Sequence, residues 1–135
     1  MSTVSIPTHS DPRVEAVFDD IRTTRKTDYI NNFWQYLAFD PGLLEETWQQ
    51  VKEVMATPGE LDPLTREMIY IAVSIANSCR YCIHSHTAAA RAQGMTESQY
   101  AELLKVVSLA GKTNHLLNAL QVPVDEVFDA DAQAV

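Results

Sequence analysis

The chain has 135 residues, of which 46% are hydrophobic, and its 10 basic and 18 acidic side chains give a formal charge of −8. This length suits one ordinary domain with its own core, and the composition is that of a globular protein rather than a disordered or fibrous one. Because the chain is acidic and has no Lys/Arg cluster, we expect neither nucleic acid nor a membrane surface as a partner.

The N-terminal segment carries no recognisable targeting signal. Residues 1–11 are polar and lack the basic start and the apolar run of a signal peptide, and no stretch reaches the length of a membrane span. We therefore expect a cytoplasmic protein. In that reducing compartment, two cysteines with C-x-x-C spacing are more often catalytic or metal-binding than part of a structural disulfide.

Two N-terminal helices are expected over residues 11–39. Asp11 and Pro12 supply an N-cap and a first-turn proline. A short aromatic segment follows over residues 30–39, and Asp40 with Pro41 ends it and begins another helix. In the first helix, apolar residues recur at helical spacing, namely Val14, Val17, Phe18 and Ile21.

The middle of the chain predicts two further helices. The one that starts at Asp40-Pro41 should end at residues 57–59, where the sequence reads Thr-Pro-Gly. The next starts at Asp62-Pro63 and runs to about Ala76, and it is almost wholly apolar from Met68 onward. Its β-branched residues also suit a buried strand, but its length, its cap and its helical neighbours favour a buried helix.

Further helices are expected in the C-terminal part. Asn77 and Ser78 are predicted to cap a helix over residues 79–93, which Gly94 ends. Thr96 and Gln99 have capping-box spacing and begin a helix to about residue 110. Gly111 is predicted to break it before a last helix over 113–121, and residues 125–135 form a loose acidic tail. The predicted fold is all-α, a bundle of about six to seven helices in a single domain, residues 1–135.

Cys79, Cys82 and His86 form the strongest candidate for a functional site. At about 100° per residue, the three side chains share one narrow stripe of their helix. The cysteines lie in its first turn, where unpaired N–H groups and the helix dipole favour a thiolate. His86, one turn beyond Cys82, is placed to take its proton, and two cysteines at this spacing can close a disulfide. The pattern predicts a redox-active dithiol with an attendant histidine.

Glu67 and Tyr81 are further candidates for this site, and His84 is not. Glu67 stands at the polar start of the preceding helix, and its carboxylate would contact the dithiol and relay a proton if the two helices pack antiparallel. Tyr81 starts about 100° from Cys82 and is an accessory candidate, because its ring can fold back near the helix end. His84 lies about 160° from His86 on the helix and is left out.

The motif resembles that of a known family. Glu67 is followed, after eleven residues, by Cys-Arg-Tyr-Cys at positions 79–82 and, after three more residues, by His86. This pattern resembles the alkylhydroperoxidase (AhpD-like) branch of the carboxymuconolactone decarboxylase family. The resemblance covers about residues 40–122 and extends more loosely over the N-terminal helices. It implies an AhpD-like helical bundle that assembles as a homo-oligomer, a trimer or hexamer.

The resemblance also implies a function and residue roles. The chain would be a thiol-dependent peroxidase that reduces organic hydroperoxides and is regenerated by an external dithiol or protein reductant. Cys82 would correspond to the peroxidatic thiol, Cys79 to the resolving thiol, and His86 and Glu67 to the proton relay. Tyr81 occupies a position that holds a further histidine in some members. The decarboxylase branch does not rely on a C-x-x-C pair, so its activity is not implied.

A zinc site is the alternative interpretation of the same residues. The two cysteines and His86 would be three ligands, with His115 or Glu67 as the fourth, and thiolate and imidazole ligands suit Zn²⁺. Against it, the sequence has no second C-x-x-C and no closely spaced histidine pair. This alternative describes a zinc-stabilised or redox-sensing helical interaction protein without turnover. The peroxidase interpretation requires no metal and no organic cofactor.

Overall fold

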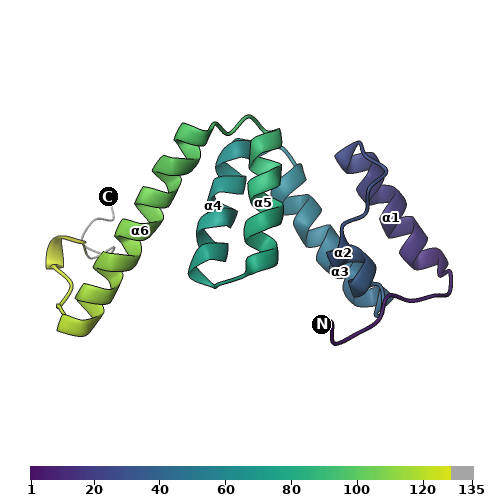
Figure 1. The fold of residues 1–135 in the computed structure, drawn as a ribbon, viewed down its shortest axis with the longest axis horizontal. Helices are drawn as coiled ribbons and strands as arrows, with labels where there is room; N and C mark the ends of the chain where they lie inside the picture. Colours follow the sequence, from purple (N-terminus) through teal and green to yellow (C-terminus); the bar gives the residue numbers. More distant parts are fainter. Residues whose placement is uncertain (129–135) are drawn as a thin grey trace. The chain divides into compact units, whose positions relative to one another are not determined.

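The computed structural model describes residues 1–128, which fold into helices joined by short turns (Figure 1). The all-α class and six main helices are confirmed within this range, and none of these helices combines the length and apolar character needed to cross a bilayer. The elements are α1 (Pro12–Arg25), α2 (Asn32–Leu37), α3 (Pro41–Val51), the π-helical η1 (Lys52–Ala56), α4 (Pro63–Ala76), α5 (Arg80–Ala92), α6 (Glu97–Leu120) and the short 3₁₀ turn η2 (Glu126–Phe128).

The chain forms two compact units, Met1–Pro63 and a second that begins at Leu64. The first contains α1, α2, α3 and η1, and the second contains α4, α5 and α6. That all 135 residues make one domain stays a prediction.

Two predicted caps set the start of α1 and α3 in the first unit. Asp11 accepts a hydrogen bond from the backbone N–H of Arg13 at 2.8 Å, and Asp40 accepts one from Leu43 at 3.2 Å. Each aspartate is followed by a proline, whose missing N–H costs nothing at the first helical position. The two Asp-Pro pairs therefore act as predicted.

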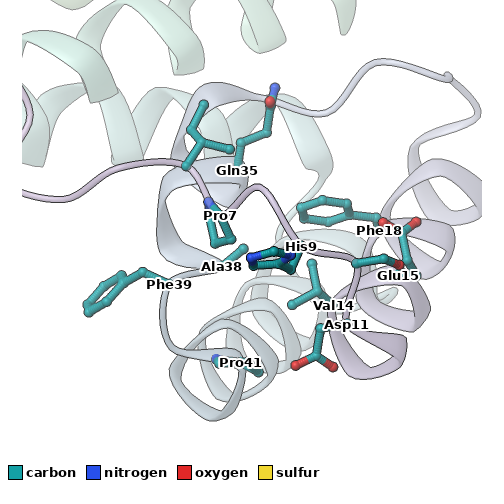
Figure 2. A pocket seen from close by; sticks show the side chains of 12 residues that line it. Pro7, His9, Asp11, Val14, Glu15, Phe18, Gln35, Ala38, Phe39 and Pro41 are labelled. Carbon is teal, nitrogen blue, oxygen red and sulfur yellow. The ribbon is translucent and has the colours of Figure 1, made fainter.

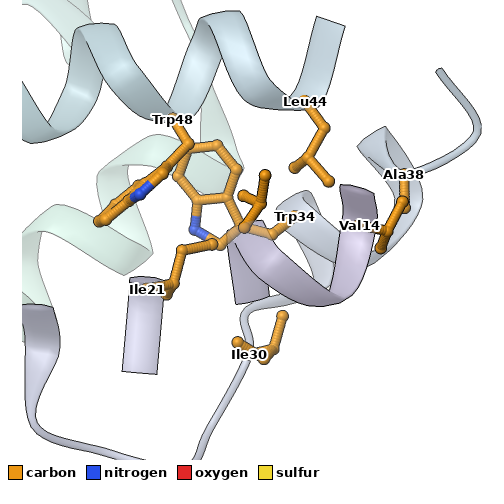
Figure 3. Packing of buried hydrophobic residues seen from close by; sticks show 8 residues of the cluster. Val14, Ile21, Ile30, Trp34, Ala38, Leu44 and Trp48 are labelled. Atoms are coloured by element: carbon orange, nitrogen blue, oxygen red, sulfur yellow. The ribbon is translucent and has the colours of Figure 1, made fainter. Parts of the chain in front are cut away.

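The first unit is built around two tryptophans (Figure 3). Trp34 of α2 and Trp48 of α3 meet edge to face, with ring centroids 5.5 Å apart, and both are almost fully buried. The guanidinium carbon of Arg25 lies 5.3 Å from the centroid of the Trp48 ring, within the range of a cation–π contact. The other buried members of this core are Val14, Val17, Ile21, Ile30, Ala38 and Leu44.

One polar contact anchors the buried Trp48 ring. Its Nε1–H donates to the Asp20 carboxylate of α1 at 2.8 Å, and the Lys52 ammonium donates to the same carboxylate at 3.0 Å. The hydrogen bond from Trp48, and then that from Lys52, lowers the pKa of Asp20 below its ordinary value of 3.8. The buried indole N–H thus has a charged acceptor, which holds α1 against α3 and the start of η1.

The second unit has a smaller core. Ile71 of α4, Ala90 of α5 and Met95 are its buried members, and Tyr100 and Leu103 of α6 pack against them. The segment 63–76 is the predicted helix and not a strand. Its apolar side chains point to all sides of the helix, and the core of the second unit covers one of those sides. Ile69 and Val73 are about half exposed, at 50% and 53%.

Helix α6 differs from the prediction. It runs unbroken from Glu97 to Leu120, so the break expected at Gly111 is wrong. A glycine inside a helix costs only about 0.5–1 kcal/mol relative to alanine, which a long helix with good helix formers on both sides can bear. The capping box at its start is confirmed, with Gln99 N–H donating to Thr96 Oγ1 at 3.0 Å. Of the expected loose tail 125–135, residues 129–135 lie outside the described part.

We predict that the Asp20 carboxylate stabilises the fold only when it is ionised. Because its folded pKa is depressed, its contribution is present above the ordinary value and is lost as the pH falls from about 5 towards 2. Asp20→Asn should lower the free energy of unfolding at pH 7 by about 1 kcal/mol, after allowing for partial exposure. Urea unfolding at pH 7 and pH 2 measures this difference.

The exposed ion pair between Arg13 and Glu45, with a 2.9 Å N–O distance, provides the matched control. Glu45→Gln should cost less than Asp20→Asn at pH 7, because water screens this pair. An equal loss at pH 7 and pH 2 for Asp20→Asn would contradict the electrostatic explanation.

Candidate functional site

The tight turn between α4 and α5 places the two cysteines. The Cys79 N–H donates to Ser74 O at 2.9 Å, and the Ser78 N–H donates to Ile75 O at 3.1 Å. Ser78 has a φ of 57°, in the left-handed region. These features are those of a Schellman motif, which ends α4 and reverses the chain. The turn therefore fixes where α5 begins.

Cys79 itself is the N-cap of α5. Its backbone is extended, with φ −88° and ψ 92°, and its sulfur accepts a hydrogen bond from the Cys82 N–H at 3.3 Å. The prediction that Asn77 and Ser78 supply the cap is wrong. Those residues belong to the C-terminal end of α4, and the left-handed Ser78 leaves the next residue to cap the new helix.

Cys79 and Cys82 are joined by a disulfide in the structure, with their Cα atoms 5.3 Å apart. That separation lies within the usual range for disulfides. Both residues are half-buried. The two cysteines of the predicted pair are thus brought together by one helical turn at the start of α5.

Glu67 and His86 form the polar link between α4 and α5. Glu67 Oε2 lies 2.6 Å from His86 Nδ1, and the two side chains are only 14% and 20% exposed. Figure 1 shows the two helices side by side as an antiparallel hairpin. The two helices thus meet the condition set for a Glu67 contact with the site, and the carboxylate bonds the histidine. With Nδ1 engaged, Nε2 is the ring nitrogen left for proton exchange.

Tyr70 is a neighbour of His86 that sequence reasoning missed. The two rings are stacked, with centroids 3.7 Å apart and planes inclined by 20°. The available signal was spacing, since Tyr70 follows Glu67 by three residues and so lies on the same side of α4. The imidazole is therefore contacted from α4 both at its edge and on its face.

The remaining sequence candidates lie at the surface. Tyr81, the accessory candidate, is 45% exposed, and His84 and His115 are exposed as well. Within residues 1–128, no three His, Cys, Asp or Glu side chains are grouped as metal ligands would be. The zinc alternative thus gains no ligand set from this part of the chain.

A cavity of about 370 Å³ lies in the first unit (Figure 2). It is open to solvent, and the extended N-terminal segment and the helices α1 and α2 form its walls. Its lining includes Pro7, His9, Glu15, Phe18 and Gln35. None of the residues of the predicted dithiol site lines this cavity.

Comparison with known proteins agrees with the motif. The chain is similar to a solved structure, the alkylhydroperoxidase AhpD core from Rhodospirillum rubrum, with 60% identity, a TM-score of 0.90, and coverage of 95% of this chain and 97% of that one. It is also 28% identical over 89 residues to uncharacterised protein 4 in the cox locus of Paracoccus denitrificans, which covers 64% of this chain and 80% of that protein. The carboxymuconolactone decarboxylase family model matches residues 42–125. The predicted resemblance is confirmed, and the chain belongs to the carboxymuconolactone decarboxylase family with an AhpD-like fold.

Proposed function

We propose that this protein is a thiol-dependent peroxidase of the alkylhydroperoxidase type that reduces organic hydroperoxides in the cytoplasm. The observation that carries the proposal is the Cys79–Cys82 pair at the start of α5, one turn before a histidine held by a half-buried carboxylate. A cysteine pair that closes a disulfide, beside a base and its orienting partner, suits two-electron thiol chemistry. The likeness to the alkylhydroperoxidase core adds independent support.

The first step makes the nucleophile. His86, one turn after Cys82 on α5, accepts the thiol proton through Nε2. Glu67, bonded to Nδ1 at 2.6 Å, holds the ring and stabilises the imidazolium that forms. Cys82 lies in the first turn of α5, where the helix dipole favours the thiolate.

The second step reduces the peroxide. The Cys82 thiolate attacks the terminal oxygen of the hydroperoxide, the O–O bond breaks, and the sulfur becomes a sulfenic acid. The leaving alkoxide takes the proton held by His86 and departs as an alcohol. Sulfur loses two electrons and the peroxide gains them, so no metal and no organic cofactor enters the step.

The third step closes the disulfide. Cys79 gives its proton to His86, which is neutral again after the second step, and the Cys79 thiolate attacks the Cys82 sulfenic acid. The S–S bond forms, the S–O bond breaks, and the hydroxyl group takes that proton and leaves as water. The Cys82 N–H that donates to the Cys79 sulfur favours negative charge on that sulfur. An external dithiol or protein reductant then returns both cysteines to thiols by exchange and is itself oxidised to a disulfide.

We also propose that the protein works as a homo-oligomer, a trimer or hexamer. Exposed apolar side chains form one stripe along α6 from Val106 to its C-terminal end. The stripe is about 100° wide, which is the width of a helix-packing face. A row of this length is unusual on a monomer and suits the same face of a second copy. Its members are Val106, Leu109, Leu116, Leu117 and Leu120, each at least 51% exposed.

Replacing the two cysteines separately tests the chemistry. Cys82→Ser should abolish consumption of an organic hydroperoxide in the presence of a dithiol, because the attacking sulfur is gone. Cys79→Ser should react once and stop as a sulfenic acid, which a sulfenic-acid probe labels and mass spectrometry detects. In the unmodified reduced protein, stoichiometric peroxide should remove both thiols. Unchanged turnover in Cys82→Ser would contradict the proposal.

Replacing the relay residues tests whether they act together. Glu67→Gln and His86→Gln should each lower the rate of peroxide reduction by about 10²-fold, the usual size of a general acid–base contribution. Because both act on one proton, the double variant should lose little more than either single variant. Independent, multiplicative losses in stopped-flow peroxide assays would show that the two residues do not form a relay.

A charge on the α6 stripe tests the assembly. Leu109→Lys combined with Leu116→Lys should shift the protein from oligomer to monomer in analytical ultracentrifugation, because the lysines would be buried between copies. Ser108→Lys is the matched control, since Ser108 is exposed and lies about 130° from the centre of the stripe, outside its edges. A wild-type monomer, or an oligomer unaffected by the paired lysines, would rule out this face.

A further inference from the structure

We propose that Tyr70 is a positioning residue for His86, and that its ring holds the imidazole in the orientation that exchanges a proton with Cys82. The inference deepens the proposed function and rests on it for the role given to the thiol. Its basis is the stack between the two rings, whose centroids are 3.7 Å apart and whose planes are inclined by 20°.

The two contacts from α4 restrain different parts of the imidazole. Glu67 bonds one edge atom, Nδ1, at 2.6 Å. Tyr70, three residues later on the same side of α4, covers a face of the ring. The imidazole of His86 is thus contacted by a carboxylate and an aromatic ring, both from α4, and its side chain is only 20% exposed.

A single hydrogen bond does not fix the plane of a histidine ring. The outer torsion of histidine is broad, so the ring can rotate about its Cβ–Cγ bond over the range in which Nδ1 stays within hydrogen-bond reach of its acceptor. A stacked ring removes this freedom, because tilting the imidazole would either break its contact with the tyrosine ring or make the two rings clash. With the plane fixed, the direction of Nε2 is fixed as well, and that atom carries the proton in the proposed first step.

The stack also suits the charge that His86 gains. When the imidazole takes the thiol proton it becomes a cation, and the face of a tyrosine ring attracts a cation through its quadrupole. Glu67 and Tyr70 therefore contact the imidazole from two directions. Neither contact depends on the tyrosine hydroxyl, so a phenylalanine should serve as well as the tyrosine.

Tyr70 can be replaced without removing the core of the second unit. Its side chain is 36% exposed, and the core cluster is made by other residues, Ile71, Ala90 and Met95. A loss of function in a Tyr70 variant can thus be separated from a loss of folding. Circular dichroism and urea unfolding provide that check.

The test measures the reactivity of Cys82 without any peroxide. In a Cys79→Ser background Cys82 is the one remaining thiol, because the chain has two cysteines, and its alkylation by iodoacetamide reports the thiolate. Tyr70→Leu should slow alkylation at pH 7 about tenfold, close to the effect of His86→Gln, whereas Tyr70→Phe should restore the rate to within about twofold. Tyr29→Leu is the matched control, an exposed tyrosine of the other compact unit.

A spectroscopic signature separates positioning from a general structural effect. A stacked tyrosine shifts the NMR resonances of the His86 ring protons upfield, and His86→Gln identifies those resonances by their disappearance. Tyr70→Leu should remove the shift, and Tyr70→Phe should keep it. The proposal would be overturned if the Tyr70→Leu variant were alkylated at the rate of the protein with Tyr70 intact. It would also be overturned if Tyr70→Phe and Tyr70→Leu slowed alkylation equally.

The outcomes for Tyr70 and for the proposed function are distinct. If the Tyr70 variants change the alkylation rate as expected but the protein consumes no organic hydroperoxide, the peroxidase proposal fails and the positioning role stands. If hydroperoxide is consumed and Tyr70→Leu alkylates at the wild-type rate with a folded spectrum, the positioning role alone fails.

Discussion

The contact between Glu67 and His86 is the interaction on which the site depends. It joins the first half of α4 to the middle of α5 across 2.6 Å, in a setting where both side chains are at least four-fifths covered. Partial burial weakens the competition from water, so the carboxylate holds the imidazole more firmly than a surface pair would. The contact also selects which ring nitrogen remains available. Without it, the C-x-x-C pair would have a nearby histidine whose ring no hydrogen bond from Glu67 orients.

The two compact units differ in how completely they bury their apolar side chains. The first encloses two tryptophans and satisfies the buried indole N–H of Trp48 with the carboxylate of Asp20. The second has few fully buried residues and leaves an apolar stripe on α6 and half-exposed branched residues on α4. The candidate redox pair therefore belongs to the unit whose own core is thin. Cover from a second copy, as proposed for α6, would supply apolar contacts that the single chain lacks.

The sequence-based expectations failed where two local signals competed. Asn77 and Ser78 are good capping residues, but the left-handed conformation at Ser78 belongs to the motif that ends α4, and so Cys79 became the cap of α5. A glycine such as Gly111 ends a helix only when the flanking residues do not offset its cost, and the good helix formers on both sides of it in α6 do so. The apolar segment after Asp62 was correctly assigned as a helix, yet its exposure could not be predicted, because pattern alone does not say which faces a neighbour covers.

The sequence by itself determined the parts of this protein that depend on spacing along one helix. Cys79, Cys82 and His86 share a stripe because each is three or four residues from the next, and the all-α class follows from caps and apolar periodicity. Only the tertiary structure decided which atoms meet across helices: that the Glu67 carboxylate reaches Nδ1 of His86, and that Tyr70 stacks on the same ring. The physical reason is that contacts between helices depend on how the α4–α5 turn sets their separation and rotation, which no periodicity within either helix specifies.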